Sequence, residues 1–255
     1  MNQLNLFIEL TRIKKPIGFM LLFWPCIWGL TIAYDFNSNL LNYFFYSFLF
    51  LAGSILMRSA GCIVNDIADK NFDKKVERTK HRPIASGKVS VKLAFTYPLM
   101  KRITYWPQLF LGITFNYGLI LAWISILNEI SLIPIIFYLG AIFWTLGYDT
   151  IYGFQDIKDD EIIGVKSTSI KFKNDPKKFL FISYFLFALS LVAIGILMNF
   201  KATYFLFLIF PFYHLFIFQI KKLNTSLSEN CFEKFKSNNF LGLLILLNLL
   251  IGKLI

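Results

Sequence analysis

The sequence predicts an all-α fold: a polytopic transmembrane helix bundle with about seven spans. Three observations predict it. Hydrophobic residues make up 56% of the 255-residue chain, whereas charged residues make up only 16%. The mean hydropathy is +0.59. The apolar residues are gathered into long uncharged blocks, and a helix needs about 20 such residues to cross the hydrocarbon core. We expect one integral membrane domain over residues 1–255.

The predicted spans follow the uncharged blocks in chain order. The first, residues 16–34, has no small-residue pattern of signal-peptide cleavage, so we expect it to remain as a helix. The last block, residues 240–252, is short and would depend on Lys253 reaching the membrane interface. The five blocks between them are residues 40–57 (extending toward Val64), 109–127, 132–148, 179–198 and 204–220.

Lysine and arginine are distributed unevenly between the two ends of the predicted bundle. With the N-terminus in the cytoplasm, the four cytoplasmic segments hold three, ten, six and four of the 26 basic residues. The opposite side has only Lys201 and Lys253, and Arg58 lies within a span. This asymmetry fixes the orientation by the positive-inside rule. Because the basic residues lie in short loops between spans, they indicate topology and do not indicate a nucleic-acid-binding surface.

The N-terminal sequence bears on the compartment in which we expect the protein. The chain shows no long mitochondrial-type presequence before its first apolar block. The sequence therefore favours a bacterial inner membrane, with a multi-pass chain whose N-terminus and active site are cytoplasmic.

The first candidate site follows the second span, where Asn65 begins a segment that also contains Asp66, Asp69 and Asp73. If the span continues as a helix, the three aspartates fall at i, i+3 and i+7 on one face. Like charges at a membrane boundary repel and are costly to desolvate, and a divalent cation would offset that cost. Mg²⁺ takes a few carboxylates, waters and substrate phosphate oxygens. The alternative is a solvated loop of mixed charge.

Basic residues near this segment could bind an anionic substrate. Arg78 and Arg82 follow the aspartates and offer fork-shaped contacts to phosphate. Tyr97 and Lys101 are spaced i, i+4, and Arg102 follows them. These residues could bind a diphosphate or an aromatic carboxylate. The alternative is a basic loop attracted to anionic lipid headgroups.

The second candidate site follows the fourth predicted span. Asp156 and Asp160 are four residues apart and Asp149 precedes Asp156 by seven, so a continuous helix would place all three on one face. Asp159 and Glu161 fall elsewhere and are expected to be solvated. Two acidic stripes at the same membrane face could clamp a diphosphate through two or more magnesium ions. Residues 166–168, which begin with Lys166, either donate hydrogen bonds to phosphate oxygens or simply cap a helix.

Arg58 is a charge within a span, which is expensive unless the side chain faces the bundle interior and is paired. We interpret it as an anchor for a carboxylate on an acceptor substrate. The alternative is a structural ion pair with an aspartate of the site. Tyr148 borders the second acidic segment and could stabilise a carbocation through its ring, although tyrosines are also common at membrane interfaces.

Three segments resemble the motifs of one enzyme family. Residues 57–87 resemble the first aspartate-rich motif of the UbiA prenyltransferases, which has the form NDxxDxxxD followed by RTxxRP. Residues 97–108 resemble the YPxMKR and PQ loop of that family, and residues 148–168 resemble its second aspartate-rich motif. The residues of all three motifs are most similar to those of the 4-hydroxybenzoate polyprenyltransferases of ubiquinone synthesis.

The resemblance implies a Mg²⁺-dependent membrane enzyme that transfers a polyprenyl group from polyprenyl diphosphate to 4-hydroxybenzoate. The bond forms at the ring carbon ortho to the hydroxyl. The implied metal ligands are Asn65, Asp66, Asp69, Asp73, Asp156 and Asp160. The implied catalytic residues are Asp69, Asp73, Asp156, Asp160 and Arg102. The expected substrate-binding residues are Arg58, Asn65, Arg78, Arg82, Tyr97, Lys101, Tyr148, Asp149 and Lys166.

One departure from the family separates the first two motifs of the chain. The family usually has nine spans, with two of them between Gly87 and Tyr97, where this chain has nine residues. We therefore expect the third and fourth helices to be missing and one wall of the bundle to be open. Two alternatives to an active prenyltransferase therefore remain: a catalytically impaired remnant of the same family and a divalent-cation transporter. A transporter would place acidic residues in the middle of several spans, and the sequence places them at one face.

Overall fold

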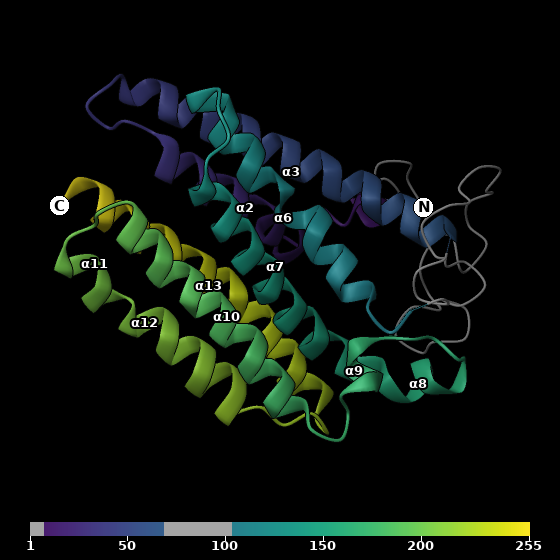
Figure 1. The fold of residues 1–255 in the computed structure, drawn as a ribbon. Helices are drawn as coiled ribbons and strands as arrows, with labels where there is room; N and C mark the ends of the chain where they lie inside the picture. The colour runs from purple at the N-terminus through teal and green to yellow at the C-terminus, as the bar shows by residue number, and fades with distance from the viewer. Residues whose placement is uncertain (1–7, 69–103) are drawn as a thin grey trace.

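The computed structural model describes residues 8–68 and 104–255, and this part of the chain is built from helices without strands (Figure 1). It contains six helical spans long and apolar enough to cross a membrane and one shorter apolar helix. The prediction of an all-α bundle of about seven spans is confirmed. The spans are α2 (Ile17–Ala33), α3 (Leu40–Ala68), α6 (Pro107–Leu127), α7 (Leu132–Gly153), α10 (Pro176–Leu197), the consecutive α11 (Ala202–Phe207), α12 (Ile209–Phe212) and η2 (Tyr213–Lys221), and α13 (Ser228–Leu254).

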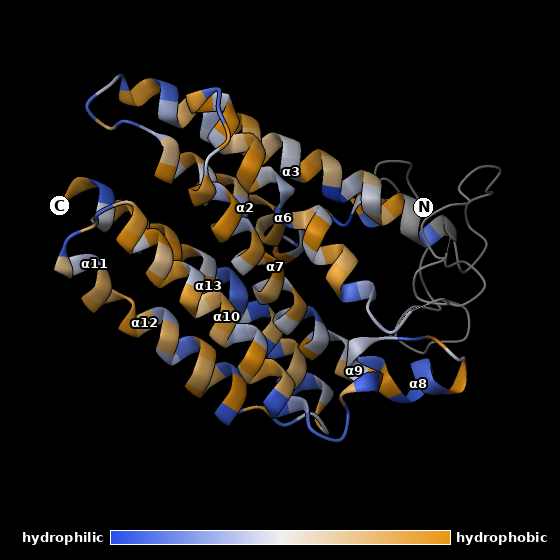
Figure 2. Cartoon of the chain, viewed as in Figure 1, coloured by the Kyte–Doolittle hydropathy of each residue, from blue (hydrophilic) through white to orange (hydrophobic). Residues whose placement is uncertain are grey.

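Helix α2 lies at the centre of the bundle and packs against α6, α13 and α3 (Figure 1). Helix α7 packs against α6 and α10, and α10 in turn contacts η2. The hydropathy of the long helices is high along most of their lengths, whereas α8 (Ile157–Ile162) and the connecting loops are hydrophilic (Figure 2). This pattern is expected when helices cross a bilayer and their connections lie in water.

A cluster of aromatic side chains fills the middle of the bundle. The Trp28 ring lies 5.0 Å from Trp144 and 5.6 Å from Phe137 between centroids, and Phe187 stacks on Trp144 at 5.9 Å. Each of these side chains is completely buried. The indole nitrogens also have acceptors, since Trp28 donates to the Gly242 carbonyl at 3.0 Å. The cluster thus joins α2, α7, α10 and α13 around one core.

Small residues allow the helix backbones to approach closely, as is common in membrane bundles. At Gly29 of α2, a Cβ atom would lie 2.2 Å from the carbonyl oxygen of Leu119 in α6. At Gly147 of α7, it would lie 2.3 Å from the ring of Tyr184 in α10. The tightest interfaces of the bundle therefore depend on the absence of a side chain.

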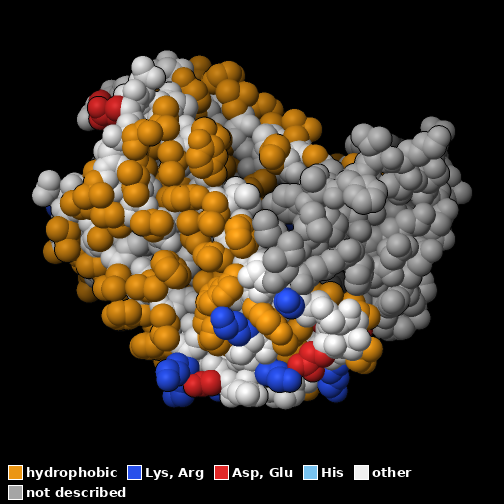
Figure 3. All heavy atoms as spheres, turned by 45° about the vertical axis from the view of Figure 1, so that its right-hand side comes forward, with side chains coloured by type: hydrophobic (Ala, Val, Ile, Leu, Met, Phe, Trp, Pro, Cys, Tyr) orange, Lys and Arg blue, Asp and Glu red, His pale blue; other side chains and the backbone are white. Residues whose placement is uncertain are grey.

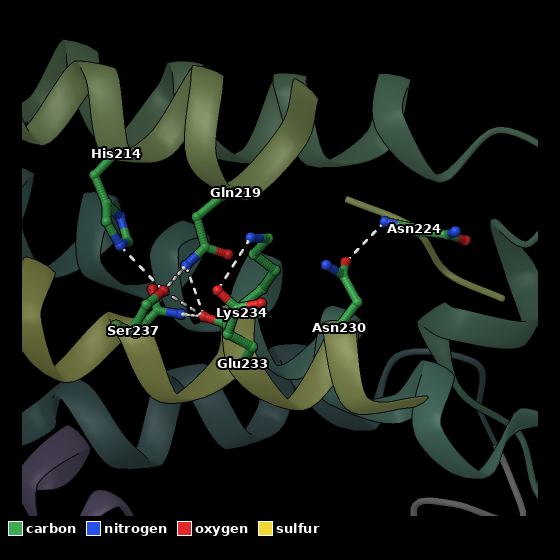
Figure 4. A network of polar contacts seen from close by, with 8 residues as sticks. His214, Gln219, Asn224, Asn230, Glu233, Lys234 and Ser237 are labelled. Atoms are coloured by element: carbon green, nitrogen blue, oxygen red, sulfur yellow. Dashed lines mark hydrogen bonds and ion pairs between the residues drawn. The ribbon is translucent and has the colours of Figure 1, made fainter. Parts of the chain in front are cut away.

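The last two spans are joined by a polar network, in which His214 and Gln219 of η2 point toward α13 (Figure 4). The Gln219 amide donates to the Lys234 carbonyl at 2.9 Å and to Ser237 Oγ at 3.1 Å, and His214 Nε2 lies 3.1 Å from the same oxygen. The Lys234 ammonium lies 3.5 Å from the centroid of the Phe218 ring. These contacts keep polar groups satisfied inside the bundle.

This network explains why the predicted bounds of the last span are wrong. The prediction stopped at residues 240–252 because charged residues precede them, yet α13 begins at Ser228 and has 27 residues. Lys234 lies in this first half and its side chain is only 3% exposed. Because η2 covers the charged half of α13, no dependence on Lys253 is needed to reach the required length.

Helix α3 is the least covered of the long spans. Only 11% of its most apolar stretch is buried inside the bundle, compared with 56% of the corresponding stretch in the span that contains α7. Its apolar side chains Leu56 and Met57, for example, are 70% and 69% exposed. Figure 3 shows a broad apolar surface with charged side chains gathered along one margin. Helix α3 therefore presents a largely uncovered apolar face.

Candidate functional site

The two acidic segments lie at the same end of the bundle. Helix α3 continues through Asp66 to Ala68, as the first motif required, and α8 lies at this end as well, opposite the C-terminus (Figure 1). Asp69 and Asp73 fall outside the described residues, and so does the side chain of Asn65. The basic candidates Arg78, Arg82, Tyr97, Lys101 and Arg102 also fall outside them.

The second acidic segment is not one continuous helix, so the predicted common face of its three aspartates needs correction. Helix α7 ends at Gly153 and is followed by a 3₁₀ turn, η1 (Phe154–Asp156), before α8 begins. A 3₁₀ turn has 3.0 residues per turn, which changes the phase between Asp149 and the residues after it. Asp156 and Asp160 remain one turn apart, and both are partly buried.

The neighbouring acidic residue Glu161 behaves as the sequence indicated. Its carboxylate pairs with Lys173 at 2.6 Å, and both side chains are exposed. An exposed pair of this kind contributes little to stability. Glu161 therefore belongs to the solvated surface and not to the candidate site.

The donor set available to a metal can be tested on the described residues. Within them, no group of three or more His, Cys, Asp or Glu side chains converges as a metal site. The second segment offers the carboxylate pair of Asp156 and Asp160 at the membrane boundary. Such a pair fits a cation that takes few protein carboxylates and completes its shell with waters and phosphate oxygens.

Asp66 of the first segment has an unexpected partner. The Arg12 guanidinium, from the stretch before α2, pairs with Asp66 Oδ1. The Asp66 side chain is only 1% exposed, whereas that of Arg12 is 21% exposed. In the sequence, Arg12 is one of the three basic residues of the N-terminal segment and indicates only topology. Its 54-residue separation from Asp66 follows no helical spacing that could have revealed the contact.

Arg58 faces the bundle interior, as predicted for a charge within a span. Its guanidinium lies against Gly18 of α2, where a Cβ atom would come within 2.4 Å of Nε. Among the described residues, no carboxylate forms an ion pair with Arg58. The described part of the chain thus gives no support to the alternative of a structural ion pair. Gly18 was not singled out from the sequence.

Tyr148 lies at the interior edge of the second acidic segment. Its side chain is 1% exposed, and its hydroxyl makes no hydrogen bond to another described residue. Phe235 of α13 packs against the Tyr148 ring at 5.9 Å and against the Tyr152 ring at 4.5 Å. These rings form an aromatic wall at the C-terminal end of α7.

The segment after α8 resolves a choice that the sequence left open. The Ser167 hydroxyl accepts a hydrogen bond from the Ile170 amide at 3.2 Å and so caps the short helix α9 (Thr168–Lys171). The Thr168 hydroxyl is 2.6 Å from that of Thr150. Both hydroxyls therefore serve the fold. Lys166 lies over the Tyr105 ring at 5.6 Å, so its ammonium remains at this end of the bundle.

Comparison with known proteins identifies relatives over nearly the whole chain. The sequence is 41% identical to "4-hydroxybenzoate polyprenyltransferase, mitochondrial" of Bos taurus, over 97% of this chain and 75% of that protein. The protein of the same name from Caenorhabditis elegans is 38% identical, over 94% of this chain and 76% of its own length. The relatives' names place those proteins in mitochondria, which does not support the expected bacterial membrane.

Solved structures show the same fold at low sequence identity. A UbiA homologue from Aeropyrum pernix K1 in its apo form matches 93% of this chain and 98% of its own, with a TM-score of 0.70 and 21% identity. A structure described as digeranylgeranylglyceryl phosphate synthase matches 99% of both chains with a TM-score of 0.63 and 19% identity. At these identities the likeness shows the fold alone.

The family comparison also bears on the gap between the first two motifs. The sequence model of the UbiA prenyltransferase family matches in two segments, residues 22–96 and 93–244. The two matches meet at residues 93–96, within the stretch where two helices were expected to be missing. The alignment with the bovine relative is 286 residues long, more than the 255 of this chain. With both segments matched and relatives of about 40% identity, the chain belongs to the UbiA prenyltransferase family.

Proposed function

We propose that this chain transfers a polyprenyl group from polyprenyl diphosphate to the ring carbon ortho to the hydroxyl of 4-hydroxybenzoate, as a step of ubiquinone synthesis. The relatives' names supply the substrates. The observation that carries the proposal is Arg58, a guanidinium in the bundle interior that no described carboxylate neutralises. An acceptor that brings its own carboxylate would neutralise this charge through paired hydrogen bonds.

Arg58 lies deeper in the bundle than Asp66, so the two ends of this helix segment can bind different substrates. Eight residues of α3 separate Arg58 from Asp66, which corresponds to about 12 Å along a helix axis. An acceptor held at Arg58 would present its ring toward the boundary where the acidic segments lie. The prenyl diphosphate would place its anionic head at that boundary and its apolar tail along the uncovered side of α3 or in lipid.

The reaction requires the allylic carbon–oxygen bond to break, with the electron pair leaving on diphosphate. We assign the holding of diphosphate and a divalent cation, proposed to be Mg²⁺, to Asn65, Asp66, Asp69, Asp73, Asp156 and Asp160. When bound, the cation neutralises charge on the leaving diphosphate. The aromatic wall that contains Tyr148 stabilises the allylic cation. The acceptor ring carbon forms the new bond, and a carboxylate of the site removes the ring proton. Lys101, Arg102, Arg78 and Arg82 are proposed to contact phosphate.

The membrane setting follows the charge asymmetry. We propose that the basic end, with the N-terminus and the acidic segments, faces the cytoplasm of a bacterial inner membrane, because the positive-inside rule orients the chain. Trypsin added to right-side-out or inverted vesicles tests this orientation. Cleavage of the basic segments only in inverted vesicles is expected, and cleavage only in right-side-out vesicles would refute it.

Assay of the purified protein in lipid nanodiscs with Mg²⁺, polyprenyl diphosphate and 4-hydroxybenzoate tests the activity. We expect a prenylated hydroxybenzoate and free diphosphate in equal amounts, with no product after chelation of the metal. Metal and diphosphate binding without product would instead identify an impaired remnant, the alternative motivated by the two helices expected to be missing. Mg²⁺ flux into liposomes without product would identify a transporter.

A further inference from the structure

The stretch before α2 reaches across the end of the bundle to the first acidic segment. Arg12 supplies the contact, and its partner Asp66 is the second residue of the NDxxDxxxD motif. The resemblance implied that Asp66, like the other aspartates of that motif, is a metal ligand. In the structure, however, a cation from the same chain pairs with its Oδ1 atom.

The backbone at Arg12 is arranged for this contact. Arg12 has a φ of +54°, in the left-handed region that non-glycine residues seldom adopt. The Lys15 amide donates to the Arg12 carbonyl at 2.8 Å and closes a tight turn just before α2. Thr11 is buried beside it, and its hydroxyl donates to the Ile8 carbonyl at 3.4 Å. A strained residue persists where surrounding contacts hold it in place, and the ion pair is such a contact.

The burial of Asp66 separates it from Asp156 and Asp160. Asp66 is 1% exposed, whereas the other two are partly exposed at the membrane boundary. A metal held together with a diphosphate needs carboxylates that substrate and solvent can reach. A buried carboxylate instead needs a compensating cation, and removal of either partner leaves an uncompensated charge. Arg12 supplies that cation to Asp66.

We propose that Asp66 is not a metal ligand and that Arg12 instead fixes it, and with it the described end of α3. This rests on the proposed function for its metal-binding part. Asn65 directly precedes Asp66 in the same helix, so any rotation of this helix end would move both residues together. The proposal removes Asp66 from the predicted metal set.

The test compares Asp66→Asn, Arg12→Met and Asp156→Asn in the full chain in nanodiscs. Binding of Mn²⁺ in the presence of inorganic diphosphate, followed by electron paramagnetic resonance, needs no turnover and reports the metal site directly. Loss of a true ligand is expected to weaken Mn²⁺ at least as much as loss of an outer-shell partner, about 10- to 100-fold. We expect that loss for Asp156→Asn, and for Asp66→Asn a weakening of less than about tenfold, which is below the range for a ligand.

Thermal unfolding supplies the second readout. Asp66→Asn and Arg12→Met should each lower the unfolding midpoint, and the double variant Arg12→Met/Asp66→Met should be no less stable than either, because partners in one contact are not additive. Arg12→Lys should recover part of the loss. Lys14→Met removes a neighbouring exposed charge and should leave the midpoint unchanged.

Two outcomes would overturn the proposal. One is Asp66→Asn weakening Mn²⁺ as strongly as Asp156→Asn does while the unfolding midpoint is unchanged. The other is additive destabilisation by the changes at Arg12 and Asp66. Should Asp66→Asn fail to fold, the apolar double variant decides through its own Mn²⁺ binding. Absence of prenyl transfer by the unaltered protein would refute the proposed function without affecting the unfolding comparison.

Discussion

Arg58 carries a charge in a membrane span, and its surroundings show how the helix tolerates it. The side chain turns away from lipid and rests on α2 at Gly18, where the missing side chain makes room for the guanidinium. A charge in a span that faces the bundle interior commonly marks a functional site. The position of the arginine therefore suits an anionic acceptor.

Replacement of Arg58 tests its role as the acceptor anchor. We expect Arg58→Met to raise the KM for 4-hydroxybenzoate by about 10- to 100-fold, since a charge-assisted hydrogen bond contributes about 1.5–3 kcal/mol. The KM for polyprenyl diphosphate should change little. Steady-state rates at saturating polyprenyl diphosphate measure the effect. An unchanged KM for the acceptor would remove Arg58 from the acceptor site.

Gly18 offers a milder probe of the same contact. In Gly18→Ala, the new Cβ atom would come 2.4 Å from Arg58 Nε, so the flexible guanidinium must move while the backbone need not. We expect a raised KM for 4-hydroxybenzoate and little loss of stability. Gly53→Ala in α3 is the matched control, because nothing lies within 4 Å of its added Cβ atom. Equal kinetics for both variants would contradict this account of the Arg58 position.

At the scale of elements, apolar runs predict where a helix crosses the bilayer but not where it begins. The sixth span illustrates the limit, since it is divided into α11, α12 and a π-helical stretch, η2. Pro211 lies within this span and lacks the amide that a regular helix requires. The irregular turns are stabilised by partners in α13, a tertiary effect that hydropathy does not contain. The charged first half of α13 was missed for the same reason.

The network between η2 and α13 should contribute measurably to stability. We expect Gln219→Leu to lower the free energy of unfolding by about 1–3 kcal/mol, because the Ser237 hydroxyl and the Lys234 carbonyl each lose a donor in a buried setting. Lys222→Met, at an exposed position nearby, is the control. Thermal unfolding in detergent, followed by circular dichroism, measures the difference. Equal midpoints for the two variants would show that the network is dispensable.

At the scale of the whole molecule, the sequence predicted the number of spans and the shared end of the bundle at which Asp66 and α8 lie. Both follow from physical rules that act locally, namely hydrophobic length and charge asymmetry. The contact between Arg12 and Asp66 could not be predicted this way, because it joins two segments that meet only in the folded bundle. The 3₁₀ turn between α7 and α8 was also missed, since the spacing of its aspartates suits an unbroken helix.

The open side of α3 connects the fold to the substrate. An enzyme that handles a polyprenyl chain must hold an anionic head near water while the tail stays in an apolar setting. In this chain the acidic end of α3 is adjacent to an apolar length that few other helices cover. The uncovered wall, which could impair a closed reaction chamber, would also let the tail enter from the bilayer.

The central claim is that both acidic segments hold one diphosphate through divalent cations at this end of the bundle. The most direct measurement is the binding of Mn²⁺ with inorganic diphosphate to the unaltered protein, to Asp69→Asn, to Asp156→Asn and to the double variant, all in nanodiscs. If the site is shared, each single change should weaken binding of the whole complex by about tenfold or more, and the double variant should lose less than the two effects added together. Two separate sites, each lost in one variant and intact in the other, would contradict the account.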